Sequence, residues 1–136
     1  FFSPKSFLAD LIAAHVVDHA DATVGVAEVS DVTRHGIIKP EGDRIIDMIG
    51  KSAPDKAPSR LGAIGVYVFE PSIIDAIRAT PPGFKGELQF TGSIKGEVLA
   101  GKKVIYRTID GIHLDVGTPH DLMRANEWYL NHCNGK

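Results

Sequence analysis

The sequence has a single cysteine, Cys133, and no apolar run near the ~18 residues needed to cross a membrane. These two absences exclude an internal disulfide framework and a membrane-spanning helix, and a reducing, cytoplasmic compartment is the simpler expectation. Neither sign of charge is in large excess, because the sequence has 15 Lys and Arg residues and 17 Asp and Glu residues. Without a basic excess, nucleic-acid binding through phosphate neutralisation is not expected.

The composition is that of a folded globular chain, with 43% hydrophobic and 24% charged residues among 136. That length suits one domain or a piece of a larger one. The first residue is Phe1 rather than Met, and no signal peptide precedes it. We therefore expect the sequence to begin within a longer protein.

Hydrophobic patterning predicts an α/β fold with a mixed β-sheet flanked by helices. The first helix is expected to start at Ser3 and Pro4, with an apolar face of Phe7, Leu8, Leu11, Ile12 and Val16. Strands are expected over residues 22–30, 35–39, 44–49, 61–69, 103–109 and 112–116. The last two should form a hairpin around Asp110-Gly111.

The remaining helices are expected after Pro71, over residues 91–100 and after a Thr118 cap. In the helix after Pro71, Ile73, Ile74 and Ile77 should point the same way. The last helix has a predicted apolar side of Leu122, Met123, Ala125, Trp128, Tyr129 and Leu130.

Asp115 stands at the end of a predicted strand, just before a Gly-containing turn into a helix. Ligand sites of open α/β sheets favour this place, because strand ends and helix N–H groups converge there. A carboxylate at such a point could hold Mg²⁺, which takes few protein ligands and prefers substrate phosphates for the rest. Spacing alone favours a plainer interpretation, in which Asp115 only caps the turn.

A transition-metal site of His113, Asp115 and His120 is an alternative, although the spacing matches no established zinc pattern. Exposed or hydrogen-bonded histidines are the expectation there. His15 and His19 are interpreted as part of a helix face near a C-terminus, where cations are favourable.

Four other residues have a functional and a structural interpretation. Lys51 ends a predicted strand and could meet a phosphate, or be a solvated loop lysine. Gly36 and Gly65 lie in predicted strands, where glycine marks close approach of a ligand or of backbone. Glu87 follows a Pro-Pro turn before a predicted helix.

Five ordered segments carry a family resemblance that spans nearly the whole chain. They are RHGII (residues 34–38), IGKS (49–52), LGAIGVYVF (61–69), GELQFTG (86–92) and LDVGTP (114–119). They resemble the family segments (R/Y)YGVV, EEKP, YAVTGLYFY, GELEITD and WLDTGTP. The chain therefore resembles the C-terminal half of the sugar-1-phosphate nucleotidyltransferases. Within that family it is most similar to the glucose-1-phosphate thymidylyltransferases and the UTP–glucose-1-phosphate uridylyltransferases.

The resemblance implies a partial Rossmann-like fold and transfer of a nucleotidyl group from a nucleoside triphosphate to a sugar 1-phosphate. Asp115 matches the second of two aspartates that hold Mg²⁺, and Lys51 matches the lysine that contacts the sugar phosphate. Gly36 matches a glycine whose backbone meets the sugar, and Gly65 lies in the strand lining that pocket. Glu87 matches an acid that supports the sugar site.

Two family segments have no counterpart here: the GxGTRLxPxT triphosphate loop and the LGDN segment with the first metal aspartate. Residues 1–136 are therefore expected to be the sugar-binding part of a nucleotidyltransferase domain, inactive alone. Gly50 and Gly92 replace acidic family residues, which leaves open a non-catalytic regulatory or assembly module. Strand edges exposed by the missing part should promote self-association into a homo-oligomer.

Overall fold

Strand β2 (Ala22–Glu28) is the centre of the computed structural model, which describes residues 2–50, 54–82, 86 and 89–133. β2 pairs antiparallel with β5 (Leu61–Phe69) and parallel with β6 (Val104–Thr108). Its first five residues are buried. A strand covered on both faces favours apolar residues, and four of these five are apolar or glycine, while the buried Thr23 is hydrogen-bonded to His15.

Five strands of mixed direction close into a small barrel in the order β2-β5-β3-β4-β6. β3 (Ile37–Glu41) and β4 (Arg44–Ile49) form a hairpin. Two contacts of one residue pair each complete the circle, Ile37 with Gly62 and Arg44 with Ile105. The mixed sheet was predicted, whereas its closure into a barrel was not.

The main hydrophobic core of the protein contains Val24, Val26, Ile38, Met48, Ile94 and Val104.

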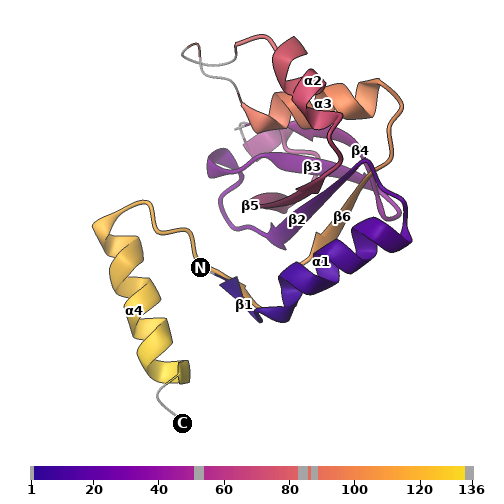
Figure 1. Cartoon of the computed structure of the whole chain (residues 1–136). Helices are drawn as coiled ribbons and strands as arrows, with labels where there is room; N and C mark the ends of the chain where they lie inside the picture. The colour runs from indigo at the N-terminus through magenta and orange to yellow at the C-terminus, as the bar shows by residue number, and fades with distance from the viewer. Residues whose placement is uncertain (1, 51–53, 83–85, 87–88, 134–136) are drawn as a thin grey trace.

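Helices cover two sides of the barrel, as Figure 1 shows. α1 (Ser6–Val17) packs on β2 and β5, while α3 (Phe90–Leu99) packs on β4 and β6 and against α2 (Ile73–Ala79). The predicted α/β class is confirmed. Ile74, however, does not share the buried side of Ile73, since it is 49% exposed. No helix in the described ranges has both the length and the hydrophobicity to span a bilayer.

The two ends of the chain differ from the prediction. Residues Phe2–Ser3 form a short strand, β1, and α1 begins only at Ser6. β1 pairs antiparallel with β7 (Ile112–His113), so the predicted hairpin around Asp110-Gly111 is wrong. The reason is topological: β6 already has β2 on one edge and β4 on the other, which leaves no edge for a returning strand.

The predicted apolar face of α1 is only partly buried. Phe7 and Leu11 are in the core, and the third buried residue of the helix is His15. His15 Nδ1 lies 2.9 Å from Thr23 Oγ1, and its Nε2 lies 3.3 Å from Glu70 Oε1. His15 is therefore a hydrogen-bonded interior residue rather than part of an exposed helix face. The exposed members of the predicted face are Leu8, Ile12 and Val16.

Helix α4 (Pro119–Cys133) stands apart from the barrel in Figure 1. Thr118 caps it as predicted, because Thr118 Oγ1 accepts a hydrogen bond from Asp121 N at 3.2 Å. The expected apolar side of this helix does not cover the sheet. Four of its large apolar side chains are more than half exposed, namely Leu122, Met123, Tyr129 and Leu130.

We expect His19→Gly to stabilise the chain by about 1 kcal/mol, because His19 has a φ of 48° where the chain leaves α1. The turn is closed by a hydrogen bond from Ala20 N to His15 O at 3.0 Å. Urea denaturation measures the change in unfolding free energy. His19→Ala is the matched control: it removes the imidazole but keeps Cβ, and should leave stability nearly unchanged. Equal changes in both variants would contradict the backbone explanation.

Candidate functional site

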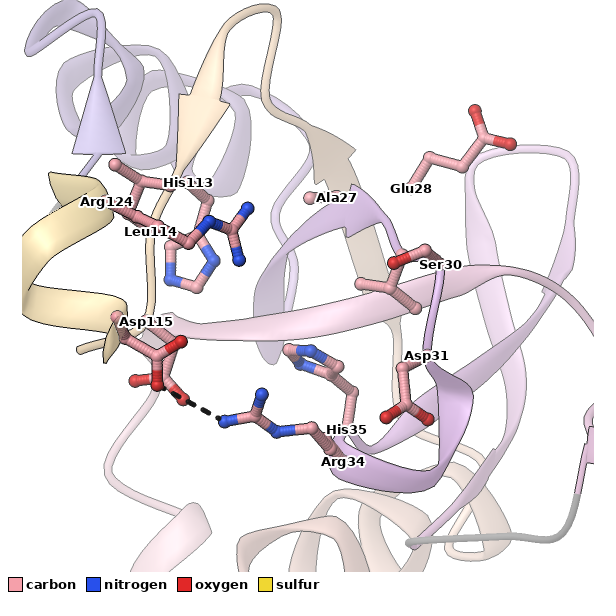
Figure 2. A pocket seen from close by; sticks show the side chains of 12 residues that line it. Ala27, Glu28, Ser30, Asp31, Arg34, His35, His113, Leu114, Asp115 and Arg124 are labelled. Atoms are coloured by element: carbon pink, nitrogen blue, oxygen red, sulfur yellow. Dashed lines mark ion pairs between the residues drawn. The ribbon is translucent and has the colours of Figure 1, made fainter. Parts of the chain in front are cut away.

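The candidate site lies where the carboxyl ends of β2 and β6 meet. Because the two strands are parallel, the residues that follow them emerge at the same edge of the sheet. A hydrogen bond from Ile109 N to Val26 O, 2.9 Å long, holds the two exits together. Between them is a cavity of about 210 Å³, drawn in Figure 2.

Charged side chains from three elements line this cavity. Arg34 and His35 come from the connection after β2, which contains the 3₁₀ turn η1 (Val32–Arg34). His113 and Asp115 come from the connection after β6, and Arg124 from α4. Figure 2 shows the Arg34 guanidinium and the rings of His35 and His113 directed into the space between the two connections. The lining also includes the carboxylates of Glu28, Asp31 and Asp121, so the cavity offers guanidinium groups to a phosphate and carboxylates to a cation.

Two aspartates of the cavity are held in the ionised state by hydrogen bonds. Asp31 Oδ1 accepts from Thr33 Oγ1 at 2.6 Å and from Thr33 N at 2.9 Å, which lowers the pKa of Asp31. The Thr118 hydroxyl donates to Asp121 Oδ2 at 2.7 Å and lowers the pKa of Asp121 in the same way. Arg34 Nη2, 3.8 Å from Asp121 Oδ2, adds to that effect.

Asp115 is an exposed residue of the connection that reaches this cavity, and it lies beyond the end of β7 at His113, whereas a strand over residues 112–116 was expected. The negative charge of Asp115 affects the pKa of His113. Partial burial lowers the pKa of His113, and the nearby Asp115 carboxylate opposes that shift because it favours the imidazolium. Positive charge on His35 lowers the pKa of His113, as burial does. The three side chains therefore form one electrostatic group.

The two predicted glycines, Gly36 and Gly65, lie elsewhere. Neither Gly36 nor Gly65 is among the residues that line this cavity. A Cβ on Gly36 would lie 2.4 Å from Thr91 Cγ2, so a protein side chain occupies the space above that glycine. Gly65 is exposed in β5 with a φ of 76°. Lys51 and Glu87 lie outside the described residues, and their roles stay predictions.

Sequence reasoning missed most residues of the cavity, among them Arg34, His35, Asp121 and Arg124. The first two were noticed only as letters of a strand motif. Their convergence with Asp115 depends on the pairing of β2 with β6, which no local pattern reveals. The zinc alternative gains no support, since the described part of the chain has no group of three His, Cys, Asp or Glu residues placed to hold a metal.

Comparisons with known proteins show which proteins the chain is similar to. The family model described as nucleotidyl transferase matches residues 5–132. The chain is 35% identical over 134 residues to the UTP–glucose-1-phosphate uridylyltransferase of Mycoplasma genitalium, covering 92% of this chain and 45% of the relative. It is 31% identical over 110 residues to the glucose-1-phosphate thymidylyltransferase of Streptomyces antibioticus, covering 80% of this chain and 30% of the relative.

Among solved structures, the chain is similar to a UDP-glucose pyrophosphorylase complexed with UDP-glucose, with a TM-score of 0.87 and 26% identity. The match covers 95% of this chain and 51% of that one. The expected nucleotidyltransferase fold is thus confirmed. The chain spans about half, or less, of the length of these relatives.

In metal-free protein we expect the His113 imidazole to titrate below the ~6.5 of an unperturbed histidine. Asp115→Asn should lower this pKa further, because it removes the charge that favours the imidazolium, and His35→Gln should raise it. Imidazole NMR signals followed against pH measure both shifts. Asp110→Asn, at an exposed position of the same connection, is the control. No response of His113 to Asp115→Asn would contradict their proximity.

Gly36→Ala should lower the free energy of unfolding by ~1–3 kcal/mol, because the new methyl meets Thr91 Cγ2 and also lies 2.9 Å from Met48 Cε. Thr91→Ser removes the nearer methyl, so it should restore part of the loss in the double variant. Chemical denaturation measures the three stabilities. Gly96→Ala is the control, since a Cβ there meets nothing within 4 Å and alanine favours the helix. An equal loss in Gly36→Ala with and without Thr91→Ser would contradict the packing.

Proposed function

The chain belongs to the nucleotidyl transferase family, within its sugar-1-phosphate members, and we propose that its protein transfers a nucleotidyl group from a nucleoside triphosphate to a sugar 1-phosphate. Glucose 1-phosphate is the proposed sugar substrate, since both curated relatives described above are named for it. The observation that carries the proposal is the position of Asp115. Its carboxylate lies at a cavity, at the shared carboxyl edge of β2 and β6, that Arg34 and Arg124 line together with other carboxylates.

The reaction is an in-line displacement, in which an oxygen of the sugar phosphate attacks the α-phosphorus and pyrophosphate leaves. Such chemistry needs positioning and neutralisation of charge more than covalent catalysis. Arg124 lines the cavity beside Asp115 and is suited to bind a phosphate oxygen. By resemblance, Lys51 would contact the sugar phosphate, and Gly36, Gly65 and Glu87 would line or support the sugar pocket.

Asp115 fits the Mg²⁺ that the family implies. Its exposed carboxylate offers the hard oxygen ligand that Mg²⁺ prefers, and phosphates of the substrates can complete the coordination. The neighbouring Asp121 is already engaged by Thr118 and faces Arg34. We therefore propose that Asp115, rather than Asp121, would hold the ion. Bound there, Mg²⁺ would neutralise the charge that develops on the phosphates.

A second candidate function is a non-catalytic regulatory or assembly module derived from the same fold. Two positions favour it, because Gly50 and Gly92 lack the carboxylates expected from the family resemblance. The structure leaves little room to restore them. A Cβ on Gly50 would lie 3.2 Å from Gln89 Oε1, and one on Gly92 would lie 3.0 Å from Thr80 Cγ2.

A pyrophosphate-release assay with glucose 1-phosphate and each nucleoside triphosphate separates these functions. We expect no turnover from the 136-residue chain, since it has no counterpart of the triphosphate loop, and turnover from a longer protein that carries the loop. In that protein Asp115→Asn should lower kcat by about 10²-fold or more, and Asp110→Asn should not. Robust turnover by the 136 residues alone would overturn the half-site proposal. An inactive longer protein with an intact loop would favour the module.

We also propose that the chain self-associates. A second proposal, based on its single cysteine, is that it functions in a reducing, cytoplasmic compartment. Barrel closure removes most free strand edges, so the physical reason for self-association differs from the one first expected. The exposed apolar faces of α1 and α4 supply it instead. Light scattering at high concentration should report a mass above 14.7 kDa. A clean monomer would contradict this proposal.

A further inference from the structure

We propose that Arg34 is a positioning residue whose ion pair with Asp121 holds the Asp115 segment over the cavity. The inference rests on the proposed function in so far as Asp115 is its functional group. Arg34 Nη2 lies 3.8 Å from Asp121 Oδ2, the contact dashed in Figure 2. The guanidinium also lies beside the turn into α4, because a Cβ on Gly117 would be 4.0 Å from the same nitrogen.

The Asp115 segment needs an anchor that the barrel core does not supply. Residues 114–117 have no regular secondary structure, and the β1–β7 pairing ends at His113. On the far side of the segment, α4 stands away from the barrel, and four of its large apolar side chains are exposed, namely Leu122, Met123, Tyr129 and Leu130. Trp128 is half-buried and lines one cavity with Leu114. The Arg34–Asp121 ion pair adds a link from the connection after β2 to the first turn of α4.

The Asp121 side chain is held in place by hydrogen bonds with Thr118. Its Oδ2 accepts from Thr118 Oγ1 at 2.7 Å, while its backbone N–H donates to the same hydroxyl at 3.2 Å. This reciprocal arrangement joins the carboxylate to the first turn of α4. The Asp121 side chain is 11% exposed, whereas Arg34 is 53% exposed. The pair is thus better shielded than the Arg78–Asp75 pair of α2, where both side chains are more than 75% exposed.

Arg34 is also fixed at its own end. It closes η1, which Asp31 caps through hydrogen bonds from both Thr33 N and Thr33 Oγ1. η1 follows directly on the central strand β2. The connection from β2 through Arg34 to Asp121 therefore sets the distance between the barrel and the start of α4. Asp115 lies between this contact and the β7 anchor at His113.

Hydrogen exchange of the 136-residue chain tests the anchor without any enzymatic activity. Arg34→Gln and Asp121→Asn should each speed exchange of the amides of residues 114–122 by about two- to fivefold, the range of an ion pair of this kind. Asn at 121 can still accept from Thr118, so the helix cap is kept. The double variant should exchange no faster than either single one. Arg78→Gln is the matched control and should leave these amides unchanged.

Kinetics in a longer active protein test the positioning role. Arg34→Gln should lower kcat and raise the Mg²⁺ concentration for half-maximal rate severalfold, and Arg34→Lys should restore part of the loss. Unchanged exchange in Arg34→Gln would overturn the anchor, and faster exchange with an unchanged Mg²⁺ requirement would overturn the positioning role. If the longer protein is inactive, the proposed function fails, and the exchange result alone decides whether the anchor exists.

Discussion

The parallel pairing of β2 with β6 is the constraint on which the candidate site depends. The pairing runs from Ala22 opposite Val104 to Val26 opposite Thr108, so both strands point toward the same edge. Arg34 and His35 follow one strand, and His113 and Asp115 follow the other. An antiparallel pairing of the same two strands would send these groups to opposite ends of the barrel. The cavity is therefore a consequence of strand direction, and its side chains only add the chemistry.

Polar contacts reinforce the start of this pairing, and a hydrogen bond from Ile109 N to Val26 O closes its end. At the start, Lys103 N donates to Asp21 Oδ2 at 2.8 Å, and Lys103 Nζ donates to Asp18 O at 2.6 Å. Arg107 forms a 2.6 Å ion pair with Asp18, which links β6 to the end of α1. Between these polar contacts the strands are buried in the apolar core. Since β6 is also paired with β4, the chain must leave the barrel after it, and this exit brings Asp115 to the site.

Features set by neighbouring residues could be predicted from the sequence, while those set by distant residues could not. The bounds of β5 and β4 and the cap of α4 follow from apolar runs, turn residues and a Thr-Pro start, and the structure has them where they were expected. The partner of β7 is β1, at the opposite end of the chain, so a local hairpin rule gave the wrong pairing. His15 is buried because Thr23 and Glu70 satisfy its ring nitrogens, and no helical periodicity contains that information. Asp115 was found from a local motif, but the charged side chains around it, such as Arg34 and Asp121, are brought there by the barrel.

The most direct test of the central claim is an amide chemical-shift titration of the 136-residue chain with glucose 1-phosphate in the presence of Mg²⁺. If the edge shared by β2 and β6 is the sugar-phosphate site, the largest shifts should fall on the connection after β2, residues 28–36, and on residues 113–121. Shifts confined to the larger cavity between α2 and α3, of about 630 Å³, would contradict the account. So would a spectrum that does not change.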